Sequence, residues 1–191
     1  MIPIIAFSGA SQTGKTTLGR RLALYCHGKF VSFGDYVREQ AQNRGISNPT
    51  REDLQNLGQQ LVESDVNRFC QHVLDTVRFS SGQRLVIDGI RHTEVLSAIS
   101  QISGRQPIKL IYLHAPMNVR ESRNHKHGGF PLLAKIDAHP VESQTNKEIK
   151  ELADLILDAS ADLDTNFSQI VAWLNHECPE LVTVPSSNSA T

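Results

Sequence analysis

The sequence predicts an α/β protein of three layers, in which a parallel sheet of five strands lies between two layers of helices. Short apolar runs alternate with amphipathic segments of helical period along residues 2–175. This alternation is typical of a parallel sheet covered on both faces, with ligands at the carboxyl ends of its strands. Two stretches rich in glycine and polar residues, 9–16 and 88–91, come directly after an apolar run or at its end. We therefore expect both at the carboxyl edge of the sheet.

Length and composition fit one soluble domain. A chain of 191 residues can bury a sizeable core but is too short for two independent domains. The formal net charge of −1 gives no general basic field that would favour nucleic acid or an anionic membrane. No apolar run approaches the length of a membrane-spanning helix, and the three cysteines are isolated, as is typical of reduced thiols. We expect a cytoplasmic protein that binds neither nucleic acid nor membrane.

The first apolar run, residues 2–7, leads into a motif with the spacing G-x-x-x-x-G-K-T, the Walker A phosphate loop. Gly9 and Gly14 permit positive φ, so backbone N–H groups can surround a phosphate, and a helix expected at 15–27 adds its positive end. Lys15 is expected to bridge the β- and γ-phosphates of ATP, and the Thr16 hydroxyl to bind Mg²⁺. The predicted nucleotide site consists of Gly9, Ala10, Ser11, Gln12, Thr13, Gly14, Lys15, Thr16 and Thr17.

The next segments are predicted to be a short strand at 30–32 and two helices. Asp35 is expected to cap a helix that ends near residue 44, and Thr50 to cap a longer one, with Asp53 three residues further on. Apolar residues then keep helical spacing as far as Val77, with an interruption near Asp65. These apolar residues are expected in the core.

The second half of the chain continues the alternation. A strand at 84–88 ends on Asp88, where a second Mg²⁺ ligand is expected in a protein with a phosphate loop. Thr93 is expected to cap the next helix; a strand at 108–113 and a helix from 118 follow, and helical period is lost at 125–129, as expected of a mobile lid. A helix at 141–153, a strand at 155–157 and a last helix complete the predicted domain, residues 1–180. Residues 181–191 are expected to be a disordered tail.

Three further stretches resemble the adenylate-kinase-like superfamily of nucleoside monophosphate kinases. Residues 32–38, Ser-Phe-Gly-Asp-Tyr-Val-Arg, are similar to the segment that opens the acceptor-binding helices of these enzymes. Residues 88–91, Asp-Gly-Ile-Arg, resemble in particular the deoxynucleoside monophosphate kinase and dephospho-CoA-kinase-related branches. Arg120 and Arg123 lie where these families place lid arginines, although many relatives have more of them. The resemblance covers about residues 2–175 and implies acceptor-binding helices at 33–80 and a lid at 118–142.

The resemblance implies a kinase that moves the γ-phosphoryl of ATP, with Mg²⁺, to a small-molecule phosphate acceptor, a nucleoside or deoxynucleoside monophosphate. Arg38 and Arg91 would clamp the acceptor's phosphate, and Arg120 and Arg123 would act with the lid. Asp35 would orient the acceptor or take its proton. In a dephospho-CoA-like kinase, whose acceptor is a hydroxyl, Asp35 would have to be a general base. A regulatory nucleotide-binding protein without turnover is the other alternative, whereas a GTPase is disfavoured because the chain has no N-K-x-D.

Overall fold

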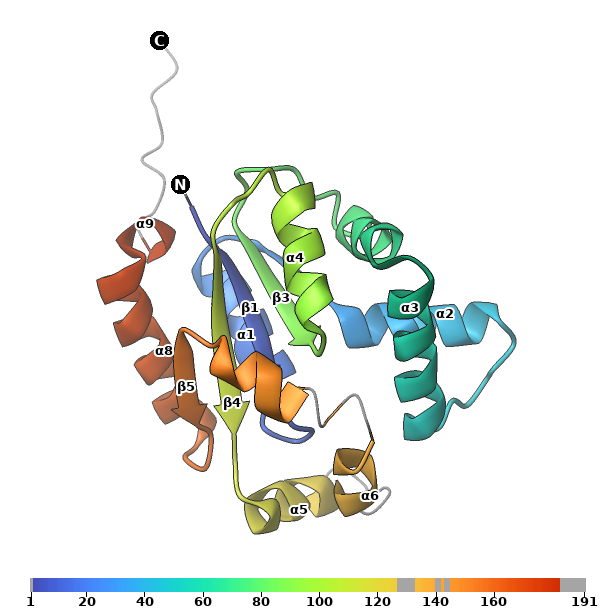
Figure 1. Ribbon diagram of the computed structural model, residues 1–191. Helices are drawn as coiled ribbons and strands as arrows, with labels where there is room; N and C mark the ends of the chain where they lie inside the picture. The colour runs from blue at the N-terminus through green and yellow to red at the C-terminus, as the bar shows by residue number, and fades with distance from the viewer. Residues whose placement is uncertain (1, 127–132, 140–141, 143–144, 183–191) are drawn as a thin grey trace.

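A five-stranded parallel sheet forms the middle layer of the computed structural model, which describes residues 2–126, 133–139, 142 and 145–182 (Figure 1). The strands are β1 (Ile4–Gly9), β2 (Lys29–Ser32), β3 (Leu85–Ile90), β4 (Ile108–His114) and β5 (Leu155–Asp158), in the order β2-β3-β1-β4-β5. All four strand pairings are parallel. The predicted fold class is confirmed.

Helices cover both faces of the sheet, because successive strand residues point to opposite sides and both sides are apolar. In β1, Ile4 and Ala6 belong to one core cluster, and Ile5 and Phe7 to the other. The first cluster is covered by α2 (Phe33–Asn43), α3 (Arg51–Asp75) and α4 (Thr93–Ile102). The second is covered by α1 (Lys15–Tyr25), α8 (Leu163–Glu177) and the short α9 (Pro179–Val182).

Two short helices lie together beyond the carboxyl end of β4 (Figure 1): α5 (Met117–Lys126) and α6 (Leu133–Asp137). The chain returns to β5 through η1 (Thr145–Ile149), a π-helical segment where we expected part of an α-helix. The lid residues 127–132 and the tail from residue 183 lie outside the described residues. Leu181 and Val182 belong to α9, and Leu181 is buried against the second core cluster, so the tail does not begin at 181.

The helix starts confirm one capping prediction and correct two. Thr50 and Asp53 form a reciprocal capping box at the start of α3. Ser32, and not Asp35, caps α2: its hydroxyl accepts a hydrogen bond from the Asp35 amide at 3.3 Å. Likewise Thr93 is the first residue of α4, and His92 stands at the capping position.

Two further features of the fold bear on the site. The expected interruption of α3 is present, because Asp65 has the non-helical angles φ −169° and ψ 93°. Strand β3 continues two residues past Asp88, since Ile90 still pairs with Ser8 of β1. Within the described part of the chain, none of the helices combines the length and the apolar character needed to cross a bilayer.

Candidate active site

The phosphate loop joins β1 to α1, and its two motif glycines have the backbone that the motif requires. Gly9 has φ 127° and Gly14 has φ 91°, both in the range that side chains with a Cβ rarely adopt. At Gly9 there is also no room for a side chain, since an added Cβ would lie 2.0 Å from the carbonyl oxygen of Leu113. The loop therefore starts where β1 presses against β4, and it ends as the N-terminus of α1.

Lys15 is folded back into its own loop. Its Nζ donates hydrogen bonds to the Ala10 carbonyl oxygen at 2.6 Å and to Thr13 Oγ1 at 3.3 Å. Burial lowers the pKa of Lys15 to about 7, and Asp88 opposes that shift. Three neighbouring cations lower it further: Arg91, Arg51 and Arg120. The loop is thus the meeting point of several positive charges, as a site for a polyphosphate requires.

Thr16 and Asp88 meet at the mouth of the loop. The Thr16 hydroxyl donates to Asp88 Oδ2 at 2.6 Å, and the Ser32 hydroxyl donates to the same oxygen at 3.4 Å. Asp88 is only 4% exposed, and its Oδ1 is buried without a hydrogen-bond partner among the described residues. A hydroxyl beside an unpaired carboxylate oxygen is a hard-oxygen donor set of the kind that Mg²⁺ prefers, so Thr16 and Asp88 would fit this ion. No group of three His, Cys, Asp or Glu side chains suited to a metal gathers elsewhere in the described residues.

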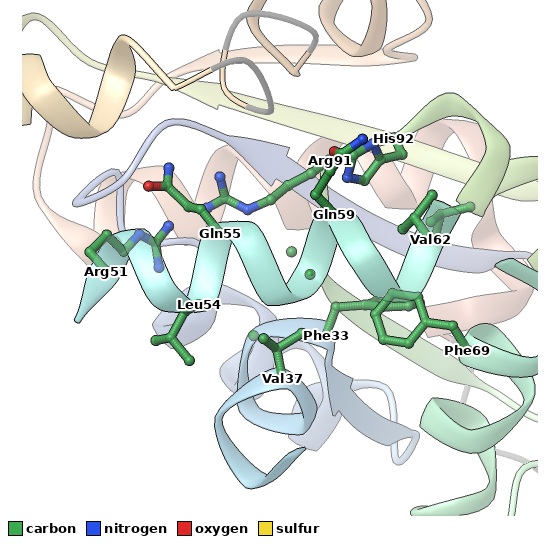
Figure 2. Close-up of a pocket in the computed structure, with 14 residues that line it drawn as sticks. Phe33, Val37, Arg51, Leu54, Gln55, Gln59, Val62, Phe69, Arg91 and His92 are labelled. Atoms are coloured by element: carbon green, nitrogen blue, oxygen red, sulfur yellow. The ribbon is translucent and has the colours of Figure 1, made fainter. Parts of the chain in front are cut away.

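A pocket lies beside the loop, between α2, α3, the end of β3 and the start of α4 (Figure 2). Its empty space, part of which is open solvent, is about 570 Å³. Phe33 and Phe69 line the apolar side, with ring centres 5.1 Å apart. The polar side carries two arginines, Arg51 and Arg91; Arg91 extends along α3 toward Arg51.

The two pocket arginines share one carboxylate. Glu142 is fully buried, and its Oε1 accepts a hydrogen bond from Arg91 Nη1. Arg51 Nη2 lies 3.5 Å from the same oxygen, and Gln55 Nε2 donates to it at 3.0 Å. Burial lowers the pKa of Arg91 to about 9, with Arg51 as the next contribution, and the pKa of Arg51 is lowered too. The pocket therefore holds two arginines whose charged forms are disfavoured by burial and by neighbouring arginines, and which share the carboxylate of Glu142.

Asp35 and Arg38, which we expected at the acceptor, lie outside this pocket. Asp35 forms ion pairs with Arg20 at 2.9 Å and with Arg38 at 2.5 Å, and about half of each side chain of the Asp35–Arg38 pair is exposed. Asp35 lines a different depression, between α2 and β2. Arg38 is nevertheless near enough to Arg51 to lower the pKa of Arg51. The structure thus places Arg91, but not Asp35, with the pocket.

Arg120 and Arg123 of α5 both contact the phosphate loop. Arg120 is 5% exposed, is held in a bidentate pair with Asp137 of α6, and lies 3.4 Å from the carbonyl oxygen of Ser11. Arg123 reaches the Gln12 carbonyl oxygen at 3.5 Å and donates to carbonyls of the loop after β5. Lys15, Thr16, Asp88, Arg91 and Arg120 are therefore brought together, while their functional roles stay predictions.

Arg51 is the pocket residue that our sequence reasoning missed. We interpreted residues 49–53 only as a helix start, and Arg51 is indeed the first residue of α3. A cation there lies at the positive end of the helix dipole, which disfavours it. An arginine in that position was the available signal that an anion, from the protein or from a ligand, lies close by.

Comparison with known proteins places the chain in a family. The AAA domain family matches residues 8–130, which is more than half of the chain. A UPF0200 protein of Pyrobaculum aerophilum is 31% identical over 64% of this chain and 65% of that protein. A cytidylate kinase of Desulfurococcus amylolyticus is 32% identical over 61% of this chain and 56% of that protein. The chain thus spans less than two thirds of the length of these relatives.

Solved structures of small kinases share the fold. A gluconokinase from Sinorhizobium meliloti superposes with a TM-score of 0.62 at 16% identity, covering 94% of this chain and 95% of that one. A shikimate kinase from Bacteroides thetaiotaomicron gives 0.56 at 16% identity, covering 94% and 99%. At such low identity this likeness concerns the fold alone. With a phosphate loop at the start of a five-stranded parallel sheet, the chain belongs to the AAA domain family and has the fold of the small P-loop kinases.

Proposed function

We propose that this protein is an ATP-dependent kinase whose acceptor is a nucleoside or deoxynucleoside monophosphate. The observation that carries the proposal is the pocket between α2, α3 and the end of β3, whose lining includes two arginines, Arg51 and Arg91, and two aromatic rings. Both arginines are close enough to Lys15 to lower its pKa. A phosphate held by Arg51 and Arg91 would therefore lie within reach of a donor phosphate held at Lys15.

The donor side follows from the loop. Backbone N–H groups of residues 9–16 and the N-terminus of α1 would hold the β-phosphate, and Lys15 would leave the Ala10 carbonyl to bind the β- and γ-phosphates. Thr16 and Asp88 would hold Mg²⁺, which neutralises charge on the phosphates when it is bound. Arg120, at the Ser11 carbonyl, is placed to stabilise charge on the transferring phosphoryl.

The acceptor side follows from the two chemistries of the pocket. Arginine pairs bind phosphate through several N–H groups at once, which fixes both position and orientation. The apolar lining of the pocket, which includes Phe33 and Phe69, would pack against a base, and Gln55 and Gln59 on α3 add amide groups to the same lining. The cytidylate kinase relative supports a nucleotide as acceptor, since that is what its name states.

A hydroxyl acceptor, as in a dephospho-CoA-like kinase, is less well supported. It would need a general base near the reacting oxygen, and Asp35 is paired with Arg20 and Arg38 outside the pocket. A monophosphate acceptor is already anionic and needs no such base. A regulatory protein without turnover is separated from both kinases by the absence of ADP production.

The test is a coupled ADP-release assay over an acceptor panel: CMP, dCMP, UMP, AMP, dephospho-CoA, gluconate and shikimate. We expect turnover with a monophosphate, and a loss of about 2–4 kcal/mol in kcat/KM for that acceptor in Arg51→Ala and Arg91→Ala, with ADP affinity nearly unchanged. Arg68→Ala is the matched control, because Arg68 is an exposed arginine of α3 away from the pocket. Turnover with a hydroxyl acceptor alone, or with none of the panel, would contradict the proposal.

A further inference from the structure

Glu142 occupies the position from which an acceptor phosphate would be held. Its carboxylate takes a hydrogen bond from Arg91, lies in an ion pair with Arg51, and takes another hydrogen bond from Gln55, all at one oxygen. The side chain is 0% exposed. It belongs to the segment that returns from the lid region, whereas its three partners line the acceptor pocket. A carboxylate from one side of the site thus neutralises arginines of the other side.

The network around Glu142 is incomplete. Its second oxygen, Oε2, is buried without a hydrogen-bond partner among the described residues, and so is Arg51 Nε. A buried charged oxygen without a donor raises the free energy of the state that contains it. A better-matched anion can therefore take the place of Glu142 between Arg51 and Arg91.

A phosphate is such an anion. It presents three acceptor oxygens and carries up to two negative charges, whereas Glu142 offers its partners one oxygen and one charge. Both anions cannot stay in the pocket side by side, since like charges that close in a buried site repel strongly.

We propose that Glu142 is an internal counter-anion of the acceptor site: it holds Arg51 and Arg91 while the site is empty and is displaced when the acceptor's phosphate binds. The proposal rests on the assignment of the pocket to the acceptor made above. It makes Glu142 a determinant of acceptor affinity, since every acceptor has to compete with it. It also differs from a positioning role, in which Glu142 would stay in place and orient the arginines.

Displacement of Glu142 has a consequence for the segment that carries it. The same segment contacts the first turns of α3 at three other points: Gln55 Nε2 donates to the Ile136 carbonyl at 3.3 Å, His139 Nε2 lies 3.1 Å from Asn56 Oδ1, and Lys135 Nζ lies 3.3 Å from Glu52 Oε2. Acceptor binding would break the buried contact of Glu142 with Arg51 and Arg91. Only the more exposed or uncharged contacts between this segment and α3 would then remain. Occupation of the pocket would thereby loosen the return segment of the lid from α3.

The test measures binding of inorganic phosphate by calorimetry to the protein saturated with Mg·ADP, so that the phosphate loop is already filled. Glu142→Gln should bind phosphate on the order of tenfold more tightly than the wild type, because a competing charge is gone while the side chain keeps its shape. Glu52→Gln is the control: Glu52 is exposed and pairs with Lys135, so its loss should leave phosphate affinity within about twofold. Arg51→Ala in the Glu142→Gln background should abolish the gain.

Equal or weaker phosphate binding by Glu142→Gln would overturn the proposal and favour the positioning role, and absence of binding in both proteins would overturn it together with the pocket assignment. If Glu142→Gln does not fold, hydrogen exchange of the wild-type protein with and without phosphate tests the proposal instead. Phosphate should reduce hydrogen-exchange protection in peptides that contain Glu142, and increased or unchanged protection would refute displacement. Lack of turnover with every acceptor, with the tenfold gain intact, would refute only the kinase proposal.

Discussion

Gly9→Ala tests whether the start of the phosphate loop is set by the packing of the two central strands. Gly9 combines φ 127° with a direct approach to β4, where an added Cβ would lie 2.0 Å from the carbonyl oxygen of Leu113 and 2.9 Å from its carbonyl carbon. Gly9 and Leu113 are also register partners in the β1–β4 pairing. The obstacle is therefore backbone on both sides, and it cannot move without loss of strand pairing.

The loss of unfolding free energy expected for Gly9→Ala has two contributions, and alanine variants at other glycines of the chain separate them. Gly82 has φ 85° and no atom within 4 Å of an added Cβ, so Gly82→Ala reports the cost of positive φ alone, about 1 kcal/mol. The clash at Gly9 adds an overpacking cost of about 1–3 kcal/mol, which gives about 2–4 kcal/mol in total for Gly9→Ala. At Gly14 the nearest atom is Leu163 Cδ2 at 3.6 Å, so Gly14→Ala should resemble Gly82→Ala in stability.

The assay is urea unfolding of the four proteins without nucleotide, followed by ADP titration of those that fold. We expect the unfolding free energy of Gly9→Ala to fall well below that of Gly82→Ala. Gly14→Ala should keep its stability but bind ADP more weakly, since its backbone N–H belongs to the phosphate site. If Gly9→Ala loses no more stability than Gly82→Ala, the strand contact does not determine the loop, and the reasoning is refuted.

Four other predictions concern the charged groups of the site. Because the pKa of Lys15 is lowered to about 7, ADP binding at pH 8 should take up about one proton, measured by calorimetry in buffers of different ionisation enthalpy; Lys15→Met should take up none, and it should also lose turnover. By the same shift, the stability of the nucleotide-free wild type relative to Lys15→Met should rise between pH 7 and pH 10, since the unfolded state keeps the Lys15 proton that the folded state releases. Asp35→Asn should leave acceptor KM, kcat and the pH profile nearly unchanged, because Asp35 lies outside the pocket, whereas a kcat loss of about 10²–10⁴ would favour the hydroxyl acceptor. Arg123→Ala should lower kcat and kcat/KM together, by up to about 10³-fold, with little change in ATP affinity; nearly full activity would make Arg123 a support of the loop after β5.

Features that depend on neighbours in the sequence could be predicted from it. The phosphate loop and the Thr50–Asp53 capping box are local patterns, and the interruption at Asp65 breaks a period that can be counted along the chain. The sheet followed from alternation of apolar runs, because only a parallel sheet between helices buries such runs on both faces. These signals need no knowledge of which distant residues meet.

The features that escaped prediction depend on distant partners. Arg91 is assigned to the acceptor from its motif, but its partners Arg51 and Glu142 lie 40 and 51 positions away in the chain, so no local pattern indicates that they share its site. The end of β3 was placed at Asp88, but pairing with β1 carries the strand to Ile90. Asp35 was expected to cap α2, but Ser32 does so. Both are good capping residues, and the exact end of β2 decides between them.

The kink at Asp65 divides α3 into two arms that perform different tasks. The arm after Asp65 supplies core side chains, since Phe69, Cys70, Val73 and Leu74 are all buried in the first core cluster. The arm before it supplies the pocket with Arg51, Leu54, Gln55, Gly58, Gln59 and Val62, while its opposite face is exposed. Most of the α3 residues that line the pocket thus lie in the first arm, although Phe69 of the second arm lines it too and Leu57 of the first arm belongs to the first core cluster. Substitutions at the partly buried lining positions of the first arm, such as Gly58 and Gln59, can change the shape of the pocket at a smaller cost to folding than substitutions in the second arm, so the pocket can diverge while the scaffold stays the same.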